Sequence, residues 1–157
     1  MFILRVDDRL IHGQVVAGWA RPLGIHALIL VSDKICADEW AYNAYQLAIP
    51  EGIDFICVGI KDCQTRIKEK DTNHMMIIVS SVWEAFRLLE EGIEVKEVNI
   101  GGLSYREGTR EIAPYIYLTS EDIDAVVKLF QRGVKVIGKQ LPNSAAIDVV
   151  KTLAGVR

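Results

Sequence analysis

Short apolar segments alternate with amphipathic segments along almost the whole chain. The apolar segments are rich in valine and isoleucine and are too short for helices. Several are apolar at nearly every position, which is typical of strands that are covered on both faces of a parallel sheet. The predicted strands are residues 2–6, 27–32, 54–59, 75–80, 97–100, 115–119 and 134–138.

The segments between these strands have the spacing and the end signals of helices. Glycine or proline follows several of them, and N-caps are expected at Ser32 or Asp33, at Ser81 and at Ser120. The predicted helices are residues 13–21, 33–48, 61–70, 82–91, 120–132 and 145–153. Residues 101–114 contain three glycines and are predicted to form an irregular loop or a partial hairpin.

The repeated alternation of strand and helix predicts an α/β fold. We expect one domain over residues 1–157, with a three-layer, open, mostly parallel sheet of about seven strands and helices on both faces. A chain of 157 residues, half of them hydrophobic, buries a real core, which excludes disorder, collagen and coiled coil.

Charge and hydropathy exclude further classes of protein. Lysine and arginine number 18 against 21 acidic residues, and no basic run is present, which argues against nucleic-acid binding. No apolar stretch approaches the roughly 20 residues of a membrane span, and the N-terminus lacks the features of a signal peptide, so we expect a cytoplasmic protein. The odd number of cysteines, Cys36, Cys57 and Cys63, all in apolar contexts, predicts free thiols.

Polar residues gather where the first predicted strand ends and the first helix begins, at the edge where α/β proteins bind ligands. They are Arg5, Asp7, Asp8, Arg9, His12, Gly13 and Gln14. A helix N-terminus offers unpaired N–H groups, guanidinium groups match phosphoryl oxygens, and a neutral imidazole nitrogen is a nucleophile. The loop could therefore hold a phosphoryl group on His12. The alternative is that these charges solvate a surface turn with a local Arg5–Asp7 pair.

Two other strand ends carry residues that suit an anion. Ser80 and Ser81 can cap the following helix, donate to an anion, or do both. Gly101 and Gly102 can expose backbone N–H groups as an anion-binding nest, and Arg106 could reach the same centre. Capping is the default interpretation for the two serines, and the glycine pair gains weight only if its loop lies beside the His12 loop.

Other common sites are not indicated by the sequence. His26 and His74 stand at strand starts, and no histidines have the spacing of metal ligands, so we expect no metal. No dinucleotide, P-loop or nucleophile-elbow motif is present, and we expect no cofactor. Trp19, Trp40 and Trp83 fall inside predicted helices, where burial is the simpler interpretation and a docking or dimer surface is the alternative.

The run over residues 5–15 resembles the signature of the IIB components of the bacterial phosphoenolpyruvate-dependent sugar phosphotransferase system, in the mannose/fructose/sorbose family. The resemblance spans nearly the whole chain, and it extends to residues 31–33, 99–102, 106, 120–123 and 132–134. There is one departure. The family often has a small hydroxyl residue after a proline near the C-terminus, where Pro142 is here followed by Asn143.

The resemblance implies a phosphoryl carrier. Such a component accepts a phosphoryl group from phosphorylated IIA and passes it to a sugar that the membrane components IIC and IID translocate, and sugars of this class are mannose, fructose, sorbose and N-acetylgalactosamine. The activity implied is that of a protein-Nπ-phosphohistidine–sugar phosphotransferase of the EC 2.7.1 class. A cytoplasmic location, with membrane attachment only through IIC and IID, follows from the same resemblance.

The resemblance also assigns roles to residues. It places the phosphohistidine at His12 and turns Arg9 toward the phosphoryl group and the acidic site of IIA. Asp7, Gly13 and Gln14 match the same loop. Neighbouring loop positions match as phosphate supports, namely Ser80, Ser81, Gly101, Gly102 and Arg106.

Two other functions stay open at the level of sequence. A non-enzymatic module that senses a phosphorylated metabolite would bind an anion reversibly, and a small phosphatase with His12 as nucleophile would release phosphate. A carrier would form a stable adduct instead. The sequence does not choose among Asp7, Asp8 and a backbone carbonyl as the group that fixes the His12 tautomer, and it leaves the sugar and a homo-oligomeric state open.

Overall fold

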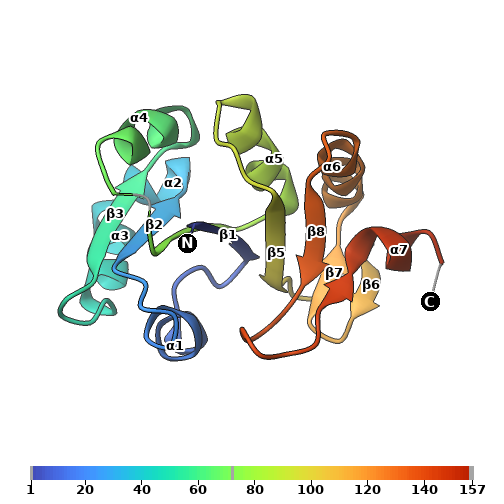
Figure 1. Ribbon diagram of the computed structural model, residues 1–157, viewed down its shortest axis with the longest axis horizontal. Coiled ribbons are helices and arrows are strands. Elements are labelled where there is room, and N and C mark those ends of the chain that lie inside the picture. The colour runs from blue at the N-terminus through green and yellow to red at the C-terminus, as the bar shows by residue number, and fades with distance from the viewer. Residues whose placement is uncertain (1, 72, 156–157) are drawn as a thin grey trace.

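The computed structural model describes residues 2–71 and 73–155, and its centre is a seven-stranded sheet in the order β3-β2-β4-β1-β5-β8-β9 (Figure 1). The strands from β3 to β8 are parallel, and β9 pairs antiparallel with β8 at one edge. Their bounds are β1 Phe2–Asp7, β2 Ala27–Val31, β3 Asp54–Val58, β4 Met75–Val79, β5 Glu97–Gly102, β8 Lys135–Gly138 and β9 Ile147–Asp148.

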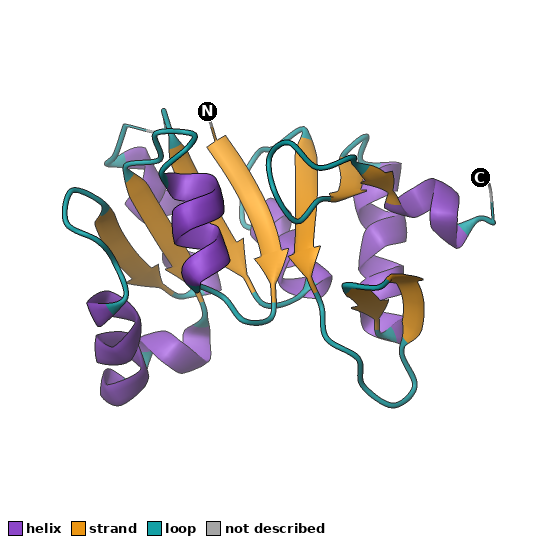
Figure 2. Ribbon diagram, turned by 90° about the horizontal axis from the view of Figure 1, so that it is seen from below, coloured by secondary structure: helices purple, strands orange, loops and turns teal. Residues whose placement is uncertain are grey.

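Helices cover both faces of this sheet. The α1 helix continues into the π-helix η1, and both lie in front of the sheet in Figure 2. The other face carries α4, α5, α6 and α7, whose buried residues share one core with the sheet. The helix bounds are α1 Gly13–Val15, η1 Val16–Ala20, α2 Asp33–Cys36, α3 Glu39–Leu47, η2 Ile60–Asp62, α4 Cys63–Lys68, α5 Val82–Glu90, α6 Ser120–Gln131 and α7 Val149–Leu153.

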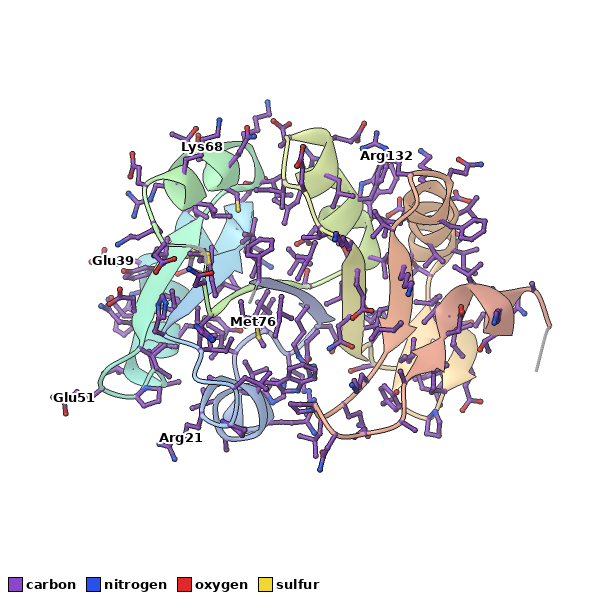
Figure 3. The ribbon with its side chains drawn as sticks, viewed as in Figure 1. Arg21, Glu39, Glu51, Lys68, Met76 and Arg132 are labelled. Atoms are coloured by element: carbon purple, nitrogen blue, oxygen red, sulfur yellow. A yellow bond between two sulfur atoms is a disulfide. The ribbon has the colours of Figure 1, made fainter. Side chains whose placement is uncertain are left out.

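Alternating residues of the central strands fill two separate cores, which is why these strands are apolar throughout. All five residues of β2 and of β4 are buried. Ile77 packs in the core under α5 and α6, while Met76 and Ile78 pack with Val15 on the side of α1. Figure 3 shows Met76 inside the molecule and Lys68 at its periphery. The predicted three-layer α/β fold is confirmed.

One predicted strand does not belong to the main sheet. Residues 116–118 form β7 (Ile116–Leu118), which pairs antiparallel with β6 (Arg110–Ala113) in a separate two-stranded sheet. The partial hairpin predicted for residues 101–114 thus exists in its second half. The seventh strand of the main sheet is instead β9, which lies inside the segment predicted to be a helix from residue 145. A strand of two residues is too short to show an alternating pattern.

Capping side chains confirm two of the predicted helix starts and correct two other helix predictions. Ser32 and Ser81 are confirmed as N-caps of α2 and α5. The helix predicted over residues 33–48 is broken, because the Asp38 side chain accepts a hydrogen bond from the N–H of Ala41 and starts α3 as a new helix. The N-cap of α6 is Thr119 rather than Ser120.

Two of the three cysteines form a disulfide, so the prediction of free thiols was wrong for them. Cys36 ends α2 and Cys57 lies in β3, and their Cα atoms are 5.6 Å apart although 21 residues separate them in the sequence. Cys63 is free and buried, and burial raises the pKa of its thiol to about 12. The pairing depends on how α2 lies against β3, which residue spacing does not reveal.

The three tryptophans have different environments. Trp19 is buried, and Trp83 is half-buried beside Phe86 with ring centroids 5.7 Å apart. Trp40 has 88% of its surface exposed, so the expectation of burial was wrong for this residue. Within the described residues, no helix is long and apolar enough to cross a membrane.

Candidate functional site

The chain turns sharply after β1, and this turn brings His12 back over the end of the strand. The pairing of β1 with β5 shifts register between Val6 and Asp7. The backbone N–H of Leu10 then donates to the carbonyl of Asp7 at 2.9 Å, and Leu10 itself has a φ of 58°, in the left-handed region. The Leu10 and Ile11 side chains are buried in the core, which anchors the strained turn.

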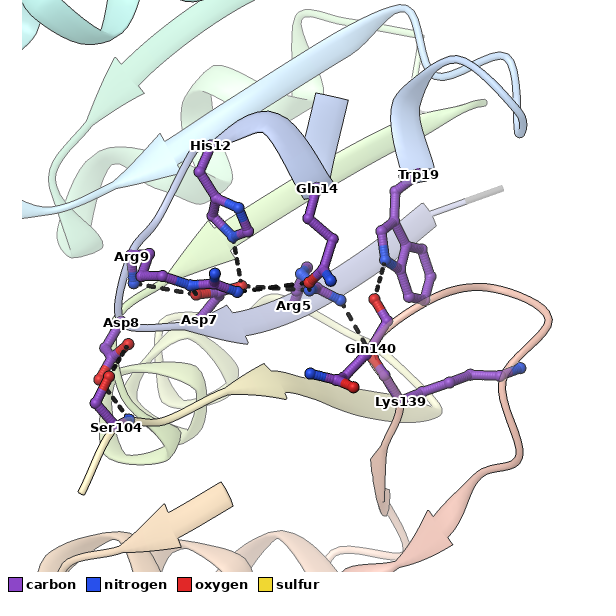
Figure 4. A network of polar contacts seen from close by, with 10 residues as sticks. All are labelled: Arg5, Asp7, Asp8, Arg9, His12, Gln14, Trp19, Ser104, Lys139 and Gln140. Carbon is purple, nitrogen blue, oxygen red and sulfur yellow. Dashed lines mark hydrogen bonds and ion pairs between the residues drawn. The ribbon is translucent and has the colours of Figure 1, made fainter. Parts of the chain in front are cut away.

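The carboxylate of Asp7 is the centre of the site (Figure 4). Its Oδ2 atom lies 2.8 Å from Nε2 of His12 and accepts a hydrogen bond from Arg5 at 3.2 Å. Its Oδ1 atom accepts from the backbone N–H of Arg9 at 3.0 Å and from Arg9 Nε at 3.4 Å. We call Arg5, Asp7, Arg9, His12 and Gln14 the histidine cluster.

The guanidinium group of Arg5 forms the floor of the histidine cluster. It is fully buried, donates to the Lys139 carbonyl at 3.3 Å and to the Gln14 side chain at 3.4 Å, and stacks over Trp19 at 4.9 Å. Burial lowers the pKa of Arg5, and the charge of Asp7 opposes that shift. Two guanidinium groups therefore share one carboxylate, which leaves the centre with an excess of positive charge.

The two predicted glycines lie beside these arginines, at the end of β5. A Cβ atom on Gly101 would overlap the guanidinium group of Arg5, whereas one on Gly102 would stand 3.6 Å from Arg9. Gly102 also accepts a backbone hydrogen bond from Asp8 at 3.1 Å. The β5 loop thus lies next to the His12 loop, and Gly101 provides the space that Arg5 occupies.

The outer side of the histidine cluster is open to an anion. The side chain of Arg9 is 52% exposed and that of His12 is 18% exposed. His12 is the N-cap of α1, and the first-turn N–H groups of Gly13, Gln14 and Val15 have no acceptor within the described chain. A Cβ atom on Gly13 would meet no atom within 4 Å. Guanidinium and amide donors beside a histidine suit a phosphoryl group.

Ser80, Ser81 and Arg106 lie outside the histidine cluster, around a separate cavity of about 440 Å³. The Ser80 hydroxyl donates to Glu84 at 2.7 Å, and the Ser81 hydroxyl accepts from the N–H of the same residue. The first two amides of α5, those of Val82 and Trp83, donate to Oδ1 of the buried Asp122. The backbone N–H groups at the start of α5 are thus used within the chain.

Several residues that support the histidine cluster were not predicted. Trp19 donates from Nε1 to the carbonyl of Gln140 at 2.7 Å, which ties η1 to the segment after β8. Burial raises the pKa of the Tyr115 hydroxyl, and the positive charge of Arg5 opposes this shift. The polar pair Lys139 and Gln140 follows a predicted strand directly and was a usable signal. Nothing in the sequence marks Trp19 or Tyr115.

Metal-binding side chains do not cluster in the part of the chain that the structure describes, where no three His, Cys, Asp or Glu side chains could hold an ion together. The donor groups of the site are instead guanidinium and amide N–H groups. The fold and these donors define a doubly wound α/β protein with a histidine–arginine site at the carboxyl edge of its sheet.

A family model described as the "PTS system sorbose subfamily IIB component" matches residues 1–156, and the chain belongs to this family. The fructose-specific EIIB component of Bacillus subtilis (strain 168) is 29% identical over 156 residues, covering 98% of this chain and 96% of that protein. The mannose-specific EIIAB component of Escherichia coli (strain K12) is 28% identical over 155 residues, which cover 97% of this chain and 48% of that protein.

Solved structures agree with this assignment. A structure described as "phosphoenolpyruvate-dependent phosphotransferase system" is 30% identical with a TM-score of 0.87, covering 99% of this chain and 98% of that one. The IIB domain of the sorbose permease from Klebsiella pneumoniae has the same fold, with a TM-score of 0.89 at 21% identity over 100% of this chain and 98% of that one.

The resemblance predicted from residues 5–15 is therefore confirmed. The chain is a IIB component of a sugar phosphotransferase system, in the class that includes mannose, fructose, sorbose and N-acetylgalactosamine components, and it belongs to the transferases. No comparison favours the alternative of a non-enzymatic binding module.

Proposed function

We propose that the chain carries a phosphoryl group on His12, accepts it from a phosphorylated IIA component and passes it to a sugar held by IIC and IID membrane components. The observation that carries this proposal is the 2.8 Å contact between His12 Nε2 and Asp7 Oδ2, on a carboxylate shared with the exposed Arg9. The sugar is of the class named for the relatives, which are fructose, mannose, sorbose and N-acetylgalactosamine components.

The contact with Asp7 selects the nitrogen that reacts. Because the carboxylate accepts the proton of Nε2, the tautomer of His12 has its lone pair on Nδ1. We assign Nδ1 as the nucleophile that attacks phosphorus in line as the donor's N–P bond breaks. The product is an Nπ-phosphohistidine. In the second transfer the N–P bond of His12 breaks as a sugar hydroxyl attacks phosphorus and releases its proton to solvent, and the His12 tautomer held by Asp7 is restored.

The surrounding donors stabilise the transferred group. We assign Arg9 and the first-turn amides of Gly13 and Gln14 to the equatorial oxygens, on which charge develops, because Arg9 is half exposed and His12 provides no side-chain cap for α1. Arg5 acts on the phosphoryl group only indirectly, because it is fully buried and pairs with Asp7 rather than reaching solvent. Ser80 and Ser81 are assigned to the cap of α5, so we leave them out of the phosphoryl-binding set.

The partners determine where such a carrier works. We propose a cytoplasmic protein that reaches the inner face of the membrane only through IIC and IID. The half-exposed charge of Arg9 would also attract an acidic surface on phosphorylated IIA, since encounters between charged proteins are steered by their fields.

The direct test is phosphorylation by a phosphorylated IIA component, measured by intact mass. We expect a mass gain of one phosphate that is lost in acid and absent from a His12→Ala variant. His26→Ala, an exposed histidine at the start of β2, is the matched control and should accept phosphate normally. Circular dichroism checks that both variants fold. A competent donor that leaves the wild-type protein unmodified would contradict the carrier proposal.

A further inference from the structure

A second site lies at the carboxyl edge of the sheet, separate from the histidine cluster. It is the cavity of about 440 Å³ described above, which we call the edge cavity. The chain leaves β1 toward α1 on one face of the sheet and leaves β4 toward α5 on the other, so the loops after these neighbouring strands diverge. Crevices at such switch points are where open α/β sheets bind ligands.

The positive groups of the edge cavity have no charged or hydrogen-bonded partner in the described part of the chain. Lys34, Arg87 and Arg106 line it, and within the described residues none of their side chains makes an ion pair or a hydrogen bond. They come from α2, α5 and the loop after β5, so three separate segments present a cation to one space. Unpaired guanidinium groups suit the oxygens of a phosphate.

Most carboxylates of the edge cavity are already bonded to donors of the chain. Asp8 accepts from Ser104, Asp33 from the N–H of Ile60, and Asp122 from two amides of α5. Glu84 accepts from Ser80, while Glu121 lies exposed at the rim. These hydrogen bonds occupy both carboxylate oxygens of Asp8 and Glu84 and one oxygen each of Asp33 and Asp122. The side chains of the three cations donate no hydrogen bond within the described residues.

The hydroxyl groups of the edge cavity divide into donors and acceptors. Ser81 and Thr119 accept backbone N–H groups as helix caps, so each keeps its own O–H proton to donate. Ser80 and Ser104 donate to carboxylates, so their oxygens keep lone pairs that can accept. An alternation of donors and acceptors is what the hydroxyl groups of a sugar require.

We propose that the edge cavity binds a hexose monophosphate, with the phosphate on Lys34, Arg87 and Arg106 and the sugar hydroxyls on the serine and threonine lining. The cavity volume fits one such molecule. The identification of this ligand as the product of sugar phosphorylation rests on the function proposed above. The binding of a hexose monophosphate does not depend on that function, because the cavity residues are distinct from the histidine cluster.

The test is a titration of the ¹⁵N-labelled protein with mannose 6-phosphate, followed by amide chemical shifts. Mannose and inorganic phosphate are the parallel probes. We expect saturable shifts at Ser81, Ser104 and Arg106, with at least tenfold weaker binding in Arg87→Gln and Arg106→Gln variants. Arg132→Gln is the matched control, since this surface arginine lies 3.9 Å from Glu90, outside the edge cavity.

Several outcomes would overturn the proposal. They are no saturable shift, equal binding of inorganic phosphate as an adventitious ion only, equal binding of mannose, and full binding in Arg106→Gln. A titration of His12→Ala separates the two sites, because loss of phosphorylation with unchanged sugar-phosphate binding supports an independent edge cavity. Phosphorylation of the wild-type protein by IIA is measured apart and decides the carrier function on its own.

Discussion

At the scale of single residues, the buried carboxylate of Asp7 controls the geometry of the site. It is fully buried, bonds two arginines and holds the imidazole of His12 through Nε2. A buried ion pair gains little net stability over an apolar pair, but removing one partner leaves a buried charge uncompensated. The pair is therefore best understood as a positioning device for His12.

An Asp7→Asn substitution tests this role. It preserves shape but removes the charge that faces Arg5 and His12, so we expect phosphoryl acceptance at least 100-fold slower and a loss of about 3–5 kcal/mol in the free energy of unfolding. The rate is measured by intact mass against time, and the stability by urea unfolding. Asp8→Asn is the control, because within the described residues the Asp8 carboxylate accepts hydrogen bonds from Ser104 alone, and Asp8 lies nearer to solvent. A normal rate in Asp7→Asn would refute the positioning role.

Arg9→Ala separates catalysis from stability. Removal of one preorganised donor to a developing charge commonly slows a reaction by about 100-fold, and we expect that effect on transfer from IIA. The free energy of unfolding should change by less than about 1 kcal/mol, because the side chain is half exposed. Single-turnover transfer and thermal unfolding are the two measurements, with Arg132→Ala as control. An Arg9→Ala protein that accepts phosphate at the wild-type rate would contradict our assignment.

The two glycines of β5 predict different outcomes for the same substitution. In Gly101→Ala the new Cβ overlaps the buried guanidinium group of Arg5, and overpacking of this kind costs about 1–3 kcal/mol. In Gly102→Ala the new atom makes an ordinary contact 3.6 Å from Arg9, and a smaller loss is expected. Urea unfolding of both variants checks this order. Equal free energies of unfolding for the two variants would show that Arg5 shifts away from the new methyl group at no cost.

At the scale of elements, the sequence predicts long and regular segments well and short ones poorly. The uninterrupted apolar runs of β2 and β4 predict strands buried on both faces, and every residue of these two strands is buried in the structure. The two-residue β9 has no periodicity to detect. The break between α2 and α3 depends on the N-cap Asp38, whose side chain accepts a hydrogen bond from Ala41. In the sequence, an aspartate at this position is compatible both with one continuous helix and with the start of a new helix.

The disulfide between α2 and β3 gives a prediction at this scale. It closes a loop with a sequence separation of 21 residues, so reduction should lower the free energy of unfolding by roughly 3 kcal/mol. Thermal unfolding with and without dithiothreitol measures the difference. A Cys36→Ser/Cys57→Ser double variant is the control and should show no response to the reductant.

Thiol labelling supplies an independent readout of the same link. Cys63 should resist iodoacetamide in the folded protein at pH 8, because its pKa of about 12 keeps the thiol protonated and burial blocks access. Labelling of Cys36 and Cys57 should appear only after reduction. Rapid labelling of either before reduction would show that the link does not form.

At the scale of the whole molecule, strand order explains which parts of the site the sequence reveals. The histidine cluster falls within residues 5–14, so its members are visible together. Lys139 and Gln140 meet it only because β8 lies beside β5, which lies beside β1. Trp19 reaches the histidine cluster because η1 carries it against Arg5. These contacts between distant residues depend on the order of the strands in the sheet. The pattern of apolar residues predicts the strands themselves but not their order.

The same topology predicts a gradient of stability across the sheet. β4 and β1 each pair with a strand on both sides and are covered by helices on both faces, whereas β9 pairs on one side over two residues. Local opening needs less free energy where fewer buried contacts are broken. We expect amide exchange to be slowest in β4, β1 and β2 and fastest in β9 and α7, as measured by hydrogen–deuterium exchange and mass spectrometry.

Reduction of the disulfide provides an internal check, because it should speed exchange in β3 and α2 and leave β9 unchanged. Equal protection in β9 and β4 would show that the sheet opens as one unit.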